Sequence, residues 1–273
     1  MTRTAPILAA LAAALAGLSA TRPAPAAADA PPVKALLVIG GCCHDYKKQQ
    51  ELLTKGISAR ANVTWTIAFD PDTGTKHLNP VYEKDDWAKG FDVVLHDECS
   101  SDVKDAKTVE KILAPHKAGL PAVVIHCGMH CYRTEGFPKA TPWFEFTGLA
   151  TTGHGPQAPI DVRYAEASNP ITKGLTGWTT VNEELYNNSA GKLLETAQPL
   201  ATGRQTYKDR GKDRTEAAVV AWTNRYNGKT RVFGTTLGHN NETVADARYL
   251  DLLARGLLWS VDKLSPEYLV PAK

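Results

Sequence analysis

The stretch Ala122–Arg133, AVVIHCGMHCYR, most constrains what this chain can fold into. Its first four residues are apolar and mostly β-branched, and such a run is typical of a central parallel strand that is buried on both faces. Histidine, cysteine and arginine residues follow at once, at the end of the strand where open α/β sheets bind their ligands. The stretch therefore predicts both a buried strand and a functional edge.

Three other apolar runs end in similar chemistry. VKALLVIGG leads into Cys42–Asp45, DVVLHDEC ends in His96–Cys99, and RVFGTTLG leads into His239–Glu242. Because the carboxyl ends of parallel strands meet at one edge of a sheet, we expect these side chains to form a single site with those of Ala122–Arg133. This convergence is the main indication of function in the sequence.

Apolar periodicity over the first half of the chain alternates between strand and helix. It predicts strands at Val33–Ile39, Val63–Phe69, Phe91–Leu95 and Ala122–Ile125, and helices at Gln49–Ala59 and Lys104–Lys117. A β-α-β-α-β order is typical of a parallel sheet with helices on both faces. The sequence therefore predicts an α/β fold with a mostly parallel central sheet.

The second half has shorter strand-like runs and ends in an amphipathic helix. The predicted strands are Ile160–Tyr164, Leu194–Thr202, Ala217–Trp222 and Arg231–Leu237, and the predicted helix is Asp246–Val261. The charged segment Thr206–Thr215 is interpreted as a loop. No internal repeat or linker divides the chain after its first thirty residues, so we expect one domain over residues 31–273.

Residues 1–30 are typical of a secretory signal peptide. Arg3 gives a short positive start, Ile7–Leu18 is an apolar core, and Ala26–Ala28 offers small residues for cleavage. The apolar core is too short to cross a bilayer, which disfavours the alternative of an uncleaved membrane anchor. We expect a periplasmic or secreted protein with no stable membrane insertion after signal cleavage.

Charge and glycine patterns argue against several classes of partner. Arg3, Arg22 and Asp29 leave with the signal, so 29 of 31 basic and 28 of 29 acidic residues remain. A nearly neutral chain without a basic run gives no indication of a nucleic-acid partner. Gly40-Gly41 lacks the third glycine of a dinucleotide-binding turn, so no nucleotide cofactor is expected.

The cysteine count is odd, which leaves at least one cysteine outside any intramolecular disulfide. Export favours one or two structural disulfides with a spare thiol. All the cysteines lie at predicted strand ends, so the alternative is that they cluster as metal ligands. They are Cys42, Cys43, Cys99, Cys127 and Cys131.

An ordered set of landmarks runs through the whole chain after the signal. It comprises VIGG with His44-Asp45-Tyr46, Ile125-His126-Cys127, NPITKGL at 169–175, Glu184-Leu185-Tyr186 and the tail RVFGTTLGHNNET. In this order the landmarks resemble the ThuA-like (trehalose utilisation) family of the class I glutamine amidotransferase-like superfamily. The resemblance implies a flavodoxin-like three-layer sandwich and a role in carbohydrate metabolism. Cys42-Cys43 and Cys127 depart from what the family leads us to expect at those positions.

Histidines and one glutamate supply enough donors for a Zn-type divalent cation. We expect His44, His126 and His239 to approach one another, with Glu184 beside them. His126, His239 and Glu184 are the predicted catalytic residues and also the predicted metal ligands. Such a site suits acid–base or metal-assisted chemistry, such as hydrolysis, elimination or isomerisation. The role in carbohydrate metabolism that the resemblance implies makes a sugar or keto-sugar the expected substrate.

Side chains of the types that line sugar sites complete the prediction, because they stack on C–H faces and hydrogen-bond hydroxyl groups. For a small-molecule carbohydrate, the predicted substrate-binding residues are His44, Asp45, Tyr46, His130, Arg133, His154, Tyr186 and Asn240. His126 and His130 are four residues apart, so a helical turn would place both on one face.

Two alternatives remain open. The superfamily's amidotransferases carry a nucleophilic cysteine on a sharp strand-to-helix turn, and Cys127-Gly128 has that setting, with His239 and Glu242 or Glu184 as base and orienter. The flanking glycines of such a turn are missing here, which disfavours a cysteine-dependent amidase or hydrolase. The other alternative is a non-catalytic carbohydrate-binding module.

Overall fold

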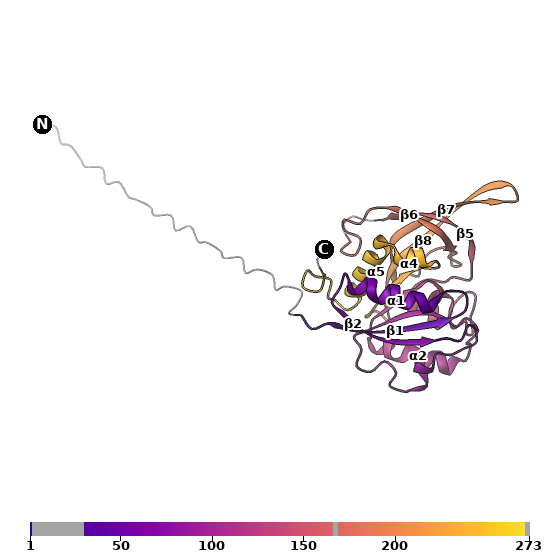
Figure 1. Ribbon diagram of the computed structural model, residues 1–273, viewed down its shortest axis with the longest axis horizontal. Coiled ribbons are helices and arrows are strands. Elements are labelled where there is room, and N and C mark those ends of the chain that lie inside the picture. The colour runs from indigo at the N-terminus through magenta and orange to yellow at the C-terminus, as the bar shows by residue number, and fades with distance from the viewer. Residues whose placement is uncertain (2–29, 166–168, 271–273) are drawn as a thin grey trace.

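The computed structural model describes Met1 and residues 30–165 and 169–270 (Figure 1). The predicted signal peptide therefore lies almost wholly outside the described residues. Over the ranges described, no helix combines the length and the apolar character needed to cross a membrane.

Nine strands of the described chain form one sheet in the order β2-β1-β3-β4-β9-β8-β7-β5-β6. The first five strands in this order pair in parallel. They are β1 (Val33–Gly41), β2 (Val63–Asp70), β3 (Val93–Cys99), β4 (Ala122–Ile125) and β9 (Thr230–Thr235). Numbered by their succession in the chain, these parallel strands run 2-1-3-4-5, which is the flavodoxin-like order with its switch point between β1 and β3.

The other half of the sheet is antiparallel, which corrects the expectation of a mostly parallel sheet. It consists of β5 (His154–Tyr164), β6 (Trp178–Tyr186), β7 (Ala197–Asp209) and β8 (Lys212–Tyr226). Parallel neighbours need a crossover of a dozen or more residues, but only short turns separate β7, β8 and β9. The chain therefore reverses direction at each of these turns.

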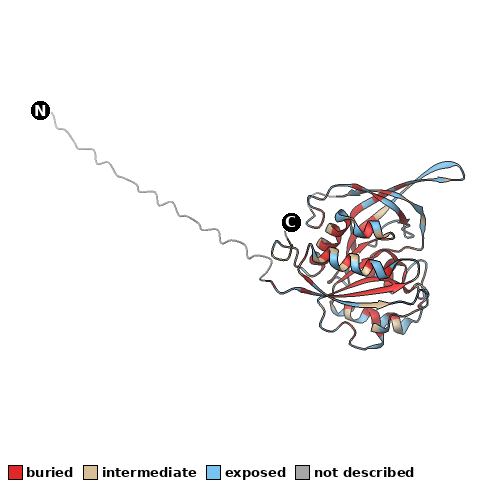
Figure 2. Cartoon of the chain, in the orientation of Figure 1, coloured by how far each residue is buried: buried red, intermediate tan, exposed pale blue. Residues whose placement is uncertain are grey.

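Helices pack on both faces of the parallel half and form two cores with it. One core includes residues of α1 (Tyr46–Ser58), α4 (Asn241–Ala245) and α5 (Ala247–Ser260), and the other includes residues of α2 (Ala106–Ala118), α3 (Pro142–Thr147) and η1 (Pro80–Glu83). Strand β1 alternates between them, because Leu37 faces the first core and Leu36 the second. Figure 2 shows the resulting burial of the central strands, which the continuous apolar runs predicted.

Helix α2 continues past Pro115 to Ala118, although a proline has no N–H for the helical bond to the carbonyl four residues earlier. That carbonyl belongs to Lys111, and the indole Nε1 of Trp87 donates to it across 3.4 Å. A side chain from outside the helix thus replaces the missing donor. The helix predicted over Lys104–Lys117 is confirmed to within two residues.

The segment Thr206–Thr215, expected to be a loop, forms the outer end of the β7–β8 hairpin. Only Arg210 and Gly211 turn, both with positive φ, as in a type I′ turn. Opposite charges face each other across the strands, with Lys208 and Asp213 at 2.8 Å. The hairpin projects from the body of the molecule in Figure 1, and its tip is exposed in Figure 2. Its polar sequence therefore reflects solvent on both faces, not the absence of a strand.

Candidate functional site

Three histidines follow three parallel strands at the carboxyl edge of the sheet: His44 after β1, His126 after β4 and His239 after β9. The ring centroid of His44 lies 4.8 Å from those of His126 and His239, which are 5.5 Å from each other. One nitrogen of each ring lies within 4.8 Å of those of the other two. The expected convergence is confirmed, and we call these three residues the histidine cluster.

Glu184 joins the histidine cluster from β6, the strand at the far edge of the sheet. Its Oε1 lies 3.3 Å from His239 Nδ1, and its Oε2 lies 3.5 Å from both His126 Nε2 and His154 Nε2. Strand β6 returns to this place because the neighbouring Glu183 carboxylate accepts from the backbone N–H groups of His239 and the residue after it, each at 3.2 Å. One carboxylate therefore contacts three imidazoles.

His126 begins the 3-10 helix η2 (His126–His130) and has φ 43°, a left-handed conformation that residues other than glycine rarely adopt. Its Nδ1 donates to the carbonyl of Thr236 at 2.6 Å, which leaves Nε2 as the unprotonated nitrogen of the neutral ring. Nε2 lies 3.3 Å from Tyr186 Oη and faces Glu184. An imidazole held this way can bind a metal or accept a proton.

The surroundings of the site shift the pKa values of His44 and His239 in opposite directions. Burial, together with repulsion from His126 and His239, lowers the pKa of His44 from 6.5 to about 2. Contact with Glu184 raises the pKa of His239, and this outweighs the effect of burial. Burial raises the pKa of Glu184, but contacts with His126 and His239 outweigh it and hold that pKa well below its usual range. At neutral pH a neutral His44 therefore lies beside an ionised carboxylate.

Glu184→Gln is expected to lower the pKa of His239 toward the 6.5 of a free histidine, because the imidazolium loses its main anionic neighbour. The pKa is read from the ring C–H resonances in an NMR titration. Glu216→Gln, which removes a carboxylate that pairs with Arg214 on the β7–β8 hairpin, should leave the His239 pKa unchanged. An unchanged pKa in the Glu184 variant would contradict this assignment.

Tyr186 forms one wall of the site and is packed against imidazoles. Its ring is stacked on that of His130 at 4.1 Å, with 3° between the planes, and its centroid lies 4.8 Å from that of His126 and 5.7 Å from that of His154. His130 is buried, and its Nε2 contacts Thr151 Oγ1 at 3.1 Å. The turn expected to align His126 with His130 is a 3-10 helix, which aligns residues three apart instead. Both rings therefore meet at Tyr186 and make no ring contact with each other.

The other predicted substrate-binding residues divide into two kinds. Tyr46 is buried with its ring centroid 5.3 Å from that of His44. The polar groups of the rest hold loops in place: Asp45 caps α1 by accepting from a first-turn N–H, Arg133 donates to a carbonyl of η2, and Asn240 donates to a carbonyl of β6. These three contacts shape the edge of the sheet and leave the histidine cluster to other side chains.

The segment His96–Cys99 does not bring all its side chains to this edge, which corrects the expectation of one site from all four runs. Successive residues of a strand point to opposite faces. His96 and Glu98 lie on the α2 side, where His96 Nε2 is 3.1 Å from His116 Nε2 and Glu98 accepts from two buried tyrosine hydroxyls. Cys99 packs in the other core, near the histidine cluster.

Sequence reasoning missed two side chains of the site. Gln157 Nε2 lies 2.8 Å from His239 Nε2 and 3.4 Å from Glu184 Oε1. Glu183 is fully buried and anchors β6, as described above. The pair Glu183-Glu184 offered no periodic signal, because both acids are buried in a strand whose residues do not alternate regularly between buried and exposed. Gln157 offered no signal in the sequence, because the pairing of β5 with β6 places its side chain beside Glu184.

A groove of about 1040 Å³ adjoins the histidine cluster. Its lining includes His154, which contacts Glu184, and Tyr186, which contacts His126, so the groove begins beside the cluster on the Glu184 side. Its lining mixes aromatic, amide and charged side chains, among them Tyr207, Asn187, Asn188, Lys192, Arg214 and Glu216. The groove therefore offers the space for a small polar ligand next to the cluster.

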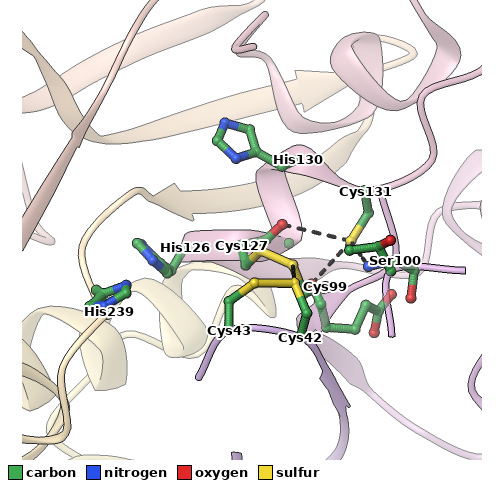
Figure 3. Close-up of a disulfide and its surroundings, with 12 residues drawn as sticks. Cys42, Cys43, Cys99, Ser100, His126, Cys127, His130, Cys131 and His239 are labelled. Atoms are coloured by element: carbon green, nitrogen blue, oxygen red, sulfur yellow. Dashed lines mark hydrogen bonds between the residues drawn. A yellow bond between two sulfur atoms is a disulfide. The ribbon is translucent and has the colours of Figure 1, made fainter. Parts of the chain in front are cut away.

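Two disulfides lie under the same edge in the described chain, Cys42–Cys43 and Cys99–Cys127 (Figure 3). Cys131 is a buried free thiol that accepts from Ser100 N at 3.1 Å. The expectation of disulfides with a spare thiol is confirmed. Cys127 is oxidised here, so neither a nucleophilic thiol nor a thiolate metal ligand is available from it in this state.

The parallel strand order and the site at the carboxyl edge define an α/β protein of the flavodoxin-like class. The model of the family described as ThuA, trehalose utilisation, matches residues 34–260. The chain belongs to the ThuA family.

Two solved structures share the fold. A ThuA-like protein from Parabacteroides merdae ATCC 43184 is 20% identical, with a TM-score of 0.60 over 85% of this chain and 90% of that one. A ThuA-like protein from Bacteroides uniformis ATCC 8492 is 16% identical, with a TM-score of 0.61 over 88% and 95% of the two chains. No curated protein matches the sequence. At these identities the likeness speaks for the fold alone.

Proposed function

We propose that this protein is an exported carbohydrate-processing enzyme that acts on a sugar or keto-sugar by acid–base or metal-assisted chemistry at the histidine cluster. The observation that carries the proposal is the contact of the single Glu184 carboxylate with His126, His154 and His239, next to the imidazole of His44. Titratable groups with displaced pKa values gather at functional sites.

The acid–base part of the proposal rests on a difference between two histidines of the cluster, one suited to donate a proton and the other to accept one. His239 has a raised pKa, so it retains a proton at higher pH than a free histidine and suits the role of general acid. The neutral form of His126 has its proton on Nδ1, so its Nε2 has the free lone pair that a general base needs. Glu184 lies between them and stabilises whichever ring is protonated. Hydrolysis, elimination and isomerisation all need such a donor and acceptor at one substrate.

The histidine cluster also fits a divalent cation. His44 Nδ1 is buried and has no hydrogen-bond partner among the described residues, whereas His239 Nδ1 contacts the Glu184 carboxylate at 3.3 Å. One nitrogen of each of the three rings lies within 4.8 Å of those of the other two. The lowered pKa of His44 keeps it in the neutral form that binds metals. These three residues and Glu184 would hold a Zn-type cation, which supplies polarisation of a carbonyl group or a more acidic water molecule.

A carbohydrate substrate is supported by the groove and by the family. The groove has aromatic and amide side chains, which suit stacking on sugar C–H faces and hydrogen bonds to hydroxyl groups. The family is described by trehalose utilisation. Export is supported by the signal-like residues 1–30. A divalent cation is the only cofactor that we include in the proposal.

Metal analysis and turnover test this function together. The mature protein is purified from the exported fraction, its zinc, manganese, iron and nickel contents are measured, and it is incubated with glycosides and their keto derivatives. We expect turnover of at least one keto-sugar or glycoside. Binding without turnover, in both metal-loaded and metal-free protein, would favour a carbohydrate-binding module and overturn the enzyme proposal.

A further inference from the structure

The disulfide-bonded cysteines form one connected group of sulfur atoms at the ends of β1, β3 and β4. Cys42 Sγ lies 3.3 Å from Cys99 Sγ, so the Cys42–Cys43 disulfide contacts the Cys99–Cys127 disulfide. Figure 3 shows the two disulfides side by side. The group lies at the switch point between β1 and β3. Because these two strands pair in parallel, with Gly41 opposite Cys99, their carboxyl ends lie next to each other.

The two disulfides differ in exposure, and we call Cys42–Cys43 the outer disulfide and Cys99–Cys127 the inner disulfide. Cys43 is exposed and Cys42 is half-buried, whereas Cys99 and Cys127 are only 4% and 6% exposed. A reductant in solution therefore reaches the outer disulfide and is kept from the inner one. The inner disulfide nevertheless contacts one sulfur atom of the outer disulfide, Cys42 Sγ.

We propose that these four cysteines form a thiol–disulfide relay that carries reducing equivalents from a dithiol reductant at Cys43 to Cys127. The relay is a redox site separate from the proposed carbohydrate chemistry. Its outer end precedes His44 in the chain and its inner end follows His126, so both ends adjoin the histidine cluster.

The first exchange reduces the outer disulfide. A thiolate of the reductant attacks Cys43 Sγ, and the Cys42–Cys43 bond breaks with Cys42 leaving as a thiolate. The second thiol of the reductant then attacks the mixed disulfide and releases Cys43. The reductant becomes a cyclic disulfide, and its two electrons and two protons remain on Cys42 and Cys43.

The second exchange is internal and involves no net oxidation or reduction. The Cys42 thiolate attacks Cys99 Sγ, which lies in contact with it. A Cys42–Cys99 bond forms while the Cys99–Cys127 bond breaks, and Cys127 leaves with the electron pair and takes up the proton that Cys42 lost. The two-electron-reduced protein then has thiols at Cys43 and Cys127.

Cys131 stands outside the relay although it is close by. Its Sγ donates to the carbonyl of Glu98 at 3.0 Å and accepts from Ser100 N, so the thiol is held in place by backbone groups. Burial, with the Glu98 charge as a smaller cause, raises its pKa well above the usual range, which keeps it a thiol. It serves as the control cysteine.

Disulfide mapping tests the relay in the wild-type protein. The oxidised protein receives one equivalent of dithiothreitol, is quenched in acid, alkylated with N-ethylmaleimide under denaturing conditions, digested and analysed by mass spectrometry. We expect a peptide pair linked through Cys42 and Cys99, with alkylated Cys43 and Cys127. A Cys99–Cys127 link that persists in all the two-electron-reduced protein, with alkylated Cys42 and Cys43, would overturn the proposal.

Two serine variants provide a matched pair. In Cys43→Ser, Cys42 has no vicinal partner, so a Cys42–Cys99 link and a free Cys127 are expected without added reductant. In Cys42→Ser the attacking sulfur is missing, so the Cys99–Cys127 link should remain, and Cys131→Ser should behave as the wild type. The same linkage pattern in both vicinal variants would also overturn the relay. The wild-type titration decides if a variant does not fold.

Discussion

Replacement of His126 by alanine is expected to lower turnover by ~10²–10⁴-fold, the range that positioned acid–base groups contribute. His126 is the member of the histidine cluster that contacts Glu184 and Tyr186 and whose second nitrogen is fixed by the carbonyl of Thr236. The same change should weaken Zn²⁺ binding by more than the ~10–100-fold that loss of an outer hydrogen bond to a ligand costs. Steady-state kinetics on the substrate found in the panel and calorimetry with ZnCl₂ measure the two effects.

Two controls separate this result from general damage. His77→Gln removes a histidine that pairs with Asp70 at 2.8 Å outside the cluster, and it should leave both quantities within a few-fold of the wild type. Cys127→Ser should retain most of the activity if the variant stays folded, because the proposed chemistry needs no thiol. A loss in Cys127→Ser as large as that in His126→Ala, with unchanged fold and metal binding, would instead support the cysteine nucleophile.

Trp222→Ala is expected to lower the free energy of unfolding by about 3–5 kcal/mol. Trp222 is fully buried in β8, and its Nε1 donates to the carbonyl of Thr147 at 2.7 Å. Its ring covers Gly234 of β9, where an added Cβ would lie 2.5 Å from Cζ2 of the indole. The side chain thus packs the first antiparallel strand onto the parallel half. Urea unfolding with an unchanged m-value gives the difference.

Trp65→Ala is the matched control, because Trp65 also makes one indole hydrogen bond, from Nε1 to Ser58 Oγ at 2.9 Å. It lies half-buried on the edge strand β2, so less apolar area is exposed by its loss. We expect its destabilisation to be less than half that of Trp222→Ala. Equal losses would show that the junction between β8 and β9 is no more important than the edge of the sheet.

Much of the parallel half could be predicted from the sequence, because burial on both faces leaves continuous apolar runs such as AVVI and LLVI. The helix after Lys104 could also be predicted, because its apolar residues lie on one face. The histidine cluster followed from chemistry placed after strands, since parallel strands must end at one edge. Strand β6 was missed because its apolar and polar residues do not alternate regularly along the sequence. Their burial depends on contacts with other segments of the chain.

The sequence by itself determined which residues end the parallel strands, and hence that His44, His126 and His239 share an edge. Local periodicity and chain direction suffice for that conclusion. Tertiary structure alone decided that Glu184 reaches them from the far edge strand, that His96 turns to the opposite core, and which cysteines pair. These outcomes depend on strand pairing and on contacts between segments far apart in the chain, and spacing along the sequence does not encode either of them.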